Sequence, residues 1–228
     1  MANRIMSHGN NDSGYILQRE LEKELYGIIP NKMANRAEVA RLIISYINTI
    51  ESDGGYKKLK EIIDLSRSLE RPIFYFSAIF KTKDVERLVS KEVIELAKLL
   101  GSYSAYIYFD AIATTKDSKG LTSNDVIELA KLLGDIYSDP YFLAIEMTGK
   151  VELLKDKRIF RNVERIKLLT RDAAYAYFRA VADTNGTLLN DEGILGNIES
   201  IKIMNLLVDA ESVYGYLMTI ANKNILRK

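Results

Sequence analysis

The chain has 228 residues, of which 47% are apolar and 28% charged, the composition of an ordinary soluble globular protein. Its 32 lysines and arginines nearly balance its 31 aspartates and glutamates, so no strong overall field draws it to nucleic acid or to an anionic membrane. It contains no cysteine, which excludes disulfides, thiolate metal sites and cysteine nucleophiles.

The first residues of the chain are small and polar, without periodicity. We therefore predict a flexible tail over residues 1–13 and a single helical-repeat domain over residues 14–228. The tail lacks the apolar core of a signal peptide, and no apolar run reaches the roughly 20 residues of a membrane-spanning helix. We expect a cytoplasmic protein that does not enter a membrane.

Apolar residues recur at helical spacing along the rest of the chain, in pairs of segments separated by short turns. In the first pair one helix begins at Gly14 and is closed by Pro30, and the other runs over about 36–51. In the fourth pair we expect Asp139 to cap the second helix and Pro140 to occupy its first turn. No strand is predicted, so the fold class is all-α. The other predicted pairs are 59–69 with 72–80, 93–101 with 105–113, 126–134 with a second helix that opens at 139, 163–169 with 173–182, and 198–208 with 212–222.

A five-residue motif occurs six times: Tyr, a large apolar residue, any residue, Ala or Thr, then Ile or Val. Its tyrosines are 29, 33, 33, 36 and 39 residues apart, the period of a stacked helical repeat. The first, fourth and fifth positions share one side of a helix, so we predict that they are buried between helices. The alternative, a ladder of rings that stack on bases or a peptide, is less favoured because Tyr shares its face with Ala and Ile. The copies begin at Tyr46, Tyr75, Tyr108, Tyr141, Tyr177 and Tyr216.

The fourth pair, from Glu128 to Lys150, resembles a HEAT repeat. Asp139 and Pro140 match that family's turn, and Arg179 alone stands where the family often has an arginine. The resemblance implies a right-handed α-solenoid of about six helical hairpins. A tetratricopeptide-like array and a compact irregular helical domain are the alternatives. The small residues of the family's second helix are matched by Ala78, Ala111, Ala144 and Ala180.

Enzyme signatures are poor in this sequence. The sole histidine is His8, in the predicted tail, and neither a phosphate-binding loop nor a dinucleotide glycine motif is present. The segment Asp183 to Gly186 partly matches a calcium loop, but Val181 would occupy its first position, so we predict a helix-ending turn there. We expect no catalytic residue, cofactor or metal.

The interpretation that follows is a non-catalytic scaffold that binds a protein or peptide. The third residue of each motif copy varies freely and falls about 200° round the helix from the tyrosine. In a HEAT-like array these residues would form a track on the concave face. This predicted track consists of Asn48, Ser77, Asp110, Leu143, Arg179 and Met218.

The alternative interpretation is a nucleic-acid-binding solenoid. Residues 150–171 are rich in lysine and arginine, and such a stretch can contact phosphates. The oligomeric state is not predicted by either interpretation. The residues expected to contact phosphate are Lys155, Lys157, Arg158, Arg161 and Arg165.

Overall fold

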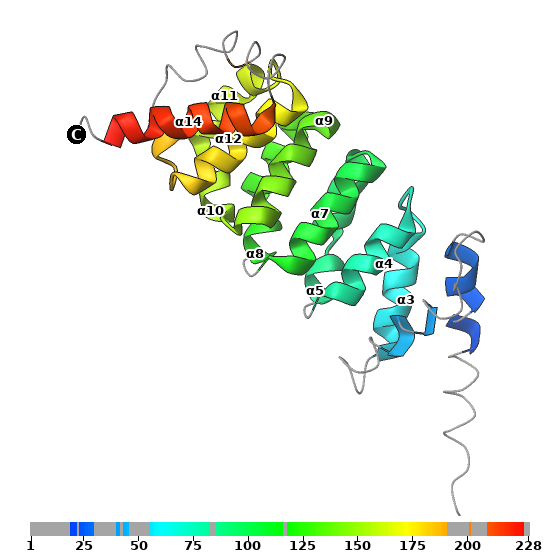
Figure 1. The fold of residues 1–228 in the computed structure, drawn as a ribbon. Helices are drawn as coiled ribbons and strands as arrows, with labels where there is room; N and C mark the ends of the chain where they lie inside the picture. The colour runs from blue at the N-terminus through cyan, green and yellow to red at the C-terminus, as the bar shows by residue number, and fades with distance from the viewer. Residues whose placement is uncertain are drawn as a thin grey trace, which may run out of the picture. The chain divides into compact units, whose positions relative to one another are not determined.

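The computed structural model describes residues 19–21, 23–29, 40–41, 43–45, 55–82, 85–115, 118–190, 201 and 209–225. Every regular element within these ranges is a helix, which confirms the predicted all-α class. Residue contacts divide the chain into two compact units, Met1–Lys83 and Asp84–Lys228, and each is described by itself (Figure 1). The predicted tail and the first motif copy lie outside the described residues.

The first unit contains two helices in contact, α3 (Gly55–Ser66) and α4 (Pro72–Lys81). Pro72 occupies the first turn of α4 as predicted, because its missing N–H has no partner to lose there. From α3, Leu59, Ile62 and Ile63 are buried at helical spacing. The buried residues of α4 are Tyr75, Phe76, Ala78 and Ile79.

In the second unit, four long helices pack side by side in chain order, α7 against α9, α9 against α12, and α12 against α14 (Figure 1). Shorter helices connect them or cover their ends. The bounds are α5 (Val85–Leu88), α6 (Lys91–Leu99), α7 (Ser102–Thr114), α8 (Ser118–Leu121), α9 (Asn124–Thr148), α10 (Val151–Leu154), α11 (Lys157–Ile166), α12 (Arg171–Asp183), the 3₁₀ turn η1 (Thr187–Asn190) and α14 (Ala210–Ile225).

Polar side chains and glycines fix the ends of these helices. The hydroxyl of Ser90 accepts a bond from the Val93 N–H, and that of Thr170 accepts one from the Ala173 N–H, so both residues act as N-caps. Gly149 ends α9 with a φ of 66°. After α12, Asn185 and Gly186 also have positive φ, so this segment is the predicted helix-ending turn.

The fourth predicted pair is formed, but its second helix starts earlier than expected. The helical segment α9 breaks at Gly134, whose φ of 74° and ψ of 178° are accessible to glycine and strained for other residues. Helix resumes at residue 135, so the prediction that Asp139 caps the second helix is wrong. Pro140 instead lies inside the helix, where it has no N–H to donate to the carbonyl of Ile136, four residues earlier. The side chain of Ile136 is exposed.

Four copies of the tyrosine motif are buried as predicted. Tyr75, Tyr108, Tyr141 and Tyr177 are at most 2% exposed, and so are their partners at i+3 and i+4. The ladder of rings open to bases or a peptide is therefore wrong for these copies. Burial raises the pKa values of these four tyrosines well above the usual one.

The large apolar residue at the second motif position also contacts neighbouring helices in the second unit. The ring of Tyr108 packs against Phe142 with centroids 4.6 Å apart, and the ring of Tyr141 packs against Phe178 at 5.3 Å. Each tyrosine thus meets the phenylalanine that follows the next tyrosine along the chain. We call these contacts the aromatic seam of α7, α9 and α12. Such pairs contribute about 0.5–1.5 kcal/mol each beyond their buried area.

The sixth copy does not follow the prediction. On α14 the motif residues Tyr216 and Ile220 are partly exposed, and Thr219 is exposed. The buried positions are instead Val213, Leu217 and Ala221, at i, i+4 and i+8. Among the described elements α14 packs mainly on α12 and η1, so a single narrow stripe suffices to cover it.

Ala144 offers a test of the close packing between α9 and its neighbours. The side chain is fully buried mid-seam, so Ala144→Leu should overpack the site and lower the free energy of unfolding by about 1–3 kcal/mol. Met147→Leu, on the same helix but 66% exposed, is the matched control and should change little. Urea unfolding followed by circular dichroism measures both variants, and an unchanged midpoint for Ala144→Leu would contradict the packing.

Tyr141 and Tyr108 differ in one respect that stability measurements can detect. The buried Tyr141 hydroxyl meets no hydrogen-bond partner among the described residues, whereas the Tyr108 hydroxyl donates to the Leu121 carbonyl at 3.4 Å. An unpaired buried hydroxyl is costly, so Tyr141→Phe should raise the free energy of unfolding by about 1 kcal/mol. Tyr108→Phe should give no such gain. A loss of stability in Tyr141→Phe would show that this hydroxyl is hydrogen-bonded in the folded protein.

Candidate functional site

The residues of the predicted track differ in what they offer to a partner. Asn48 lies outside the described residues, and Ser77 belongs to the first unit. In the second unit Leu143 and Met218 are partly exposed, but Asp110 is only 8% exposed. Little of the Asp110 side chain is therefore accessible to a binding partner.

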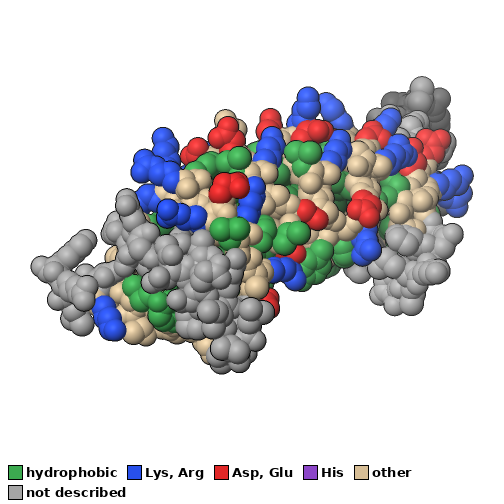
Figure 2. Space-filling model, turned by 90° about the horizontal axis from the view of Figure 1, so that it is seen from above, with side chains coloured by type: hydrophobic (Ala, Val, Ile, Leu, Met, Phe, Trp, Pro, Cys, Tyr) green, Lys and Arg blue, Asp and Glu red, His purple; other side chains and the backbone are tan. Residues whose placement is uncertain are grey.

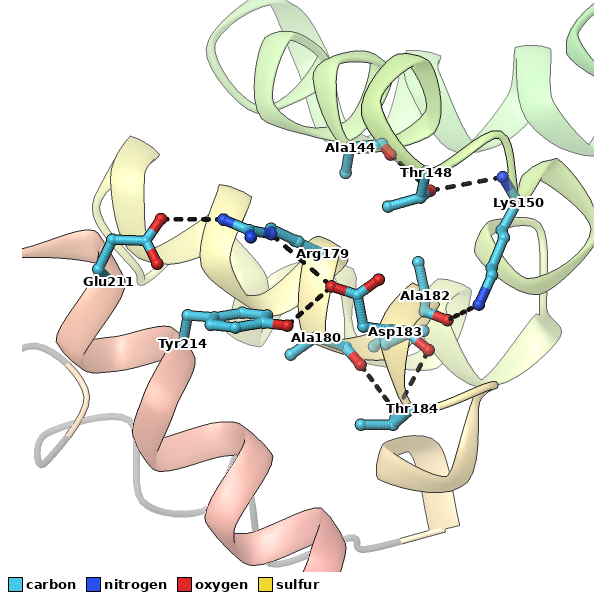
Figure 3. A network of polar contacts seen from close by, with 11 residues as sticks. Ala144, Thr148, Lys150, Arg179, Ala180, Ala182, Asp183, Thr184, Glu211 and Tyr214 are labelled. Carbon is cyan, nitrogen blue, oxygen red and sulfur yellow. Dashed lines mark hydrogen bonds and ion pairs between the residues drawn. The ribbon is translucent and has the colours of Figure 1, made fainter.

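Arg179, the remaining track residue, is engaged within the fold (Figure 3). Its guanidinium forms an ion pair with Glu211 at 2.9 Å and approaches Asp183 at 3.7 Å. It also lies over the ring of Tyr214, 4.4 Å from the centroid, while the Tyr214 hydroxyl donates to Asp183 at 2.8 Å. This network ties α12 to α14, so Arg179 has a structural role.

The predicted phosphate contacts fall into two groups. Lys155 pairs with Glu152 at 2.5 Å, and Arg158 pairs with Asp156, whose pKa is lowered by the hydrogen bond from this guanidinium. The other three cations are exposed and make no ion pair within the described part of the chain. They stand at i, i+4 and i+8 of α11, on one side of the helix, and we call them the basic face of α11. They are Lys157, Arg161 and Arg165.

A second surface was not predicted from the sequence. A Lys-Leu-Leu segment stands at the end of α6, before the break of α9 at Gly134 and directly after α11. In each segment the second leucine is buried while the first is exposed. Leu99, Leu132 and Leu168 are 64%, 49% and 55% exposed. We call these three residues the leucine row. The signal was present in the helical phase of α6: Val93, Leu96 and Leu100 form its buried stripe, and Leu99 falls outside it.

Hydrogen bonds hold the three turns that carry the leucine row next to one another. The Gly101 N–H donates to Asp135 at 2.7 Å, and the Ser104 hydroxyl contacts Asp135 and Asp139. These bonds join the turn after Leu99 to the turn after Leu132. The leucines therefore lie on adjacent parts of the molecule.

The third turn is attached in the same way. The Tyr137 hydroxyl lies 2.5 and 2.9 Å from the carbonyl oxygens of Lys167 and Leu169, which flank the third leucine of the row. Arg171 donates to Asp139 at 2.8 Å, and its guanidinium lies 5.2 Å from the Tyr103 ring centroid. We call this set of bonds across the three turns the turn clasp.

The turn clasp is suited to holding structure more than to chemistry. Asp139 is nearly buried, and burial raises its pKa, against which Ser104 and Arg171 stabilise the charged form. The carboxylate of Asp135 accepts a hydrogen bond from Gly101, and that of Asp139 accepts one from Arg171. No group of three potential metal ligands is found among the described residues.

The leucine row is bordered by charged side chains. Lys98 pairs with Glu95 at 2.9 Å and Lys167 pairs with Glu164 at 3.1 Å, both at the surface. Exposed pairs of this kind add little stability. They place charged groups next to two of the three leucines. In space-filling view, apolar side chains lie between basic and acidic ones (Figure 2).

Gly101 tests the turn clasp. A Cβ at this position would lie 2.7 Å from the Asp135 Oδ1 that the Gly101 N–H contacts, so Gly101→Ala must displace the carboxylate. We expect the free energy of unfolding to fall by about 1–3 kcal/mol because the hydrogen bonds to Asp135 are lost. Gly215→Ala on α14 has open space and should stabilise by about 0.5–1 kcal/mol. Thermal unfolding of the two variants should shift in opposite directions; a shared sign would contradict the clasp.

None of the described helices is both long and apolar enough to cross a membrane. Comparison of the chain with known protein families, with characterised proteins and with solved structures found no match.

Proposed function

We propose that this chain is a non-catalytic binding scaffold for another protein, built as a right-handed, HEAT-like α-solenoid. The tyrosine motif supports the architecture, because its copies in α7, α9 and α12 bury equivalent positions and repeat the aromatic seam. In a solenoid each hairpin contacts its neighbours, and equivalent surface positions line up along the array. An exposed residue that is repeated in each hairpin can then contact successive parts of one partner.

The leucine row is the single observation that carries the binding function. Isolated exposed leucines are ordinary, but three at equivalent positions of adjacent turns repeat an apolar contact point along the array. Helix stability does not need them, since the next leucine in each turn already fills the core. The predicted concave track is a weaker candidate because Asp110 is nearly buried and Arg179 is engaged with Glu211.

Nucleic-acid binding is the second candidate function, favoured by the basic face of α11. Its three exposed cations follow one side of the helix, a suitable arrangement for successive phosphates. Binding of this kind would weaken steeply as salt concentration rises.

Capture of partners by the immobilised chain from its source cells distinguishes these functions. A variant with Leu99→Glu, Leu132→Glu and Leu168→Glu should lose at least about tenfold in affinity for a partner protein, while melting stays close to that of the parent. The matched control carries Leu143→Glu and Met218→Glu, in the predicted track, and should keep the partner.

The reverse pattern, retention by the leucine variant and loss by the control, would contradict the leucine row and favour the concave track. Recovery of nucleic acid that disappears at high salt, with no protein dependent on the leucines, would favour the second function.

A further inference from the structure

Charge along the leucine row is uneven. The exposed face of α6 is neutral, and the part of α9 before Gly134 carries one lysine and two carboxylates, for a net charge of −1. Beside the third leucine, α11 with its flanking residues has five cations and two carboxylates, a net charge of +3. Those charged residues are Lys157, Arg158, Arg161, Arg165 and Lys167, with Asp156 and Glu164.

The spacing of the row restricts the shape of what can cover it. Packed helices lie about 8–10 Å apart, so adjacent leucines are expected about 10 Å apart. Two turns of an α-helix cover about 10.5 Å in seven residues and return to the same side. An extended strand covers that distance in about three residues, which puts successive side chains on opposite faces. A helix can therefore contact all three leucines, whereas a strand cannot.

We propose that the leucine row binds an amphipathic α-helix of a partner protein, apolar at every seventh residue and acidic at the end that lies over α11. This rests on the proposed scaffold function and specifies its ligand. The apolar residues of the partner helix cover Leu99, Leu132 and Leu168. Its carboxylates lie against the basic face of α11, whose cations make no ion pair within the described residues. Charge complementarity of this kind sets the direction in which a helix binds.

Synthetic peptides test the inference without knowledge of the natural partner. The first probe is a fluorescent helical peptide of about 18 residues with leucine at positions i, i+7 and i+14 and glutamates at one end. The second replaces those glutamates by lysines, and the third replaces the leucines by serines. Each is made with the charged cluster at either terminus, and anisotropy measures its affinity for the full chain.

The acidic probe should bind at least about tenfold more tightly than the lysine probe, and the serine probe should bind weakest. Reversal of the basic face, by Lys157→Glu, Arg161→Glu and Arg165→Glu, should invert the order of the first two probes. Leu132→Glu should weaken both. A control on the neutral helix α6, Lys91→Glu at the end of that helix away from Leu99, should leave the order unchanged.

Equal affinity for the acidic and lysine probes, or an order that survives reversal of the basic face, would overturn the acidic helix. The scaffold function would stand in that case if the natural partner still depends on the leucine row. Tighter binding of a labelled single strand of about 20 nucleotides, lost in the reversed variant, would overturn it in favour of nucleic acid. Concentration-dependent dimerisation abolished by Leu132→Glu would overturn it in favour of a second copy of the chain.

Discussion

Packing of one tyrosine against the phenylalanine of the next motif copy fixes how the helices of the second unit lie together. Tyr108 meets Phe142 and Tyr141 meets Phe178, all nearly inaccessible to solvent. Because interiors are close-packed, a shift of one helix along another would separate these rings and open voids. The small residues Ala111 and Ala144 beside them allow the helices to approach closely. The aromatic seam therefore fixes how α7, α9 and α12 are positioned relative to one another along their axes.

The position of each helix along its axis determines which turns lie next to one another. With α7, α9 and α12 aligned, the Gly101 N–H reaches Asp135 and Arg171 reaches Asp139, so the turn clasp can form. The buried charge of Asp139 would be costly without these partners. Because these bonds join the turns, the exposed first leucine of each Lys-Leu-Leu segment lies on a turn adjacent to the next one. The proposed binding surface is thus a consequence of core packing.

Local patterns in the sequence predicted much of the fold. The helical period identified the longer helices α3, α4, α6, α7, α9, α12 and α14, but it missed the short helices α5, α8 and α10 and placed the start of α11 six residues late. The shared face of Tyr, Ala and Ile predicted burial of four motif copies. The pattern failed on α14, where Val213, Leu217 and Ala221 are buried instead, because how much of a helix is covered depends on its neighbours. It also misplaced the start of the helix after Gly134, since the Asp-Pro pair resembles a cap while the glycine backbone already makes the turn.

The candidate site was harder to predict. Two of the five expected phosphate contacts, Lys155 and Arg158, pair with carboxylates two or three residues away, which the sequence makes available but does not impose. The leucine row depends on bonds between residues about thirty positions apart, such as Tyr137 with Lys167, and no local pattern contains them. Exposure of Leu99 follows from helical phase, but its proximity to Leu132 does not.

Proximity of the leucines is the central claim, and cross-linking measures it directly because the chain has no cysteine of its own. Cysteines at Leu99 and Leu132 should be joined within one molecule by a bis-maleimide that spans about 10 Å. A pair at Leu99 and Met147, at the far end of α9, should not be joined, since thirteen residues of helix span about 20 Å. Efficient cross-linking of the first pair alone is the result we expect. Failure of the first pair, or equal reaction of both, would contradict the alignment of the turns and the surface built on it.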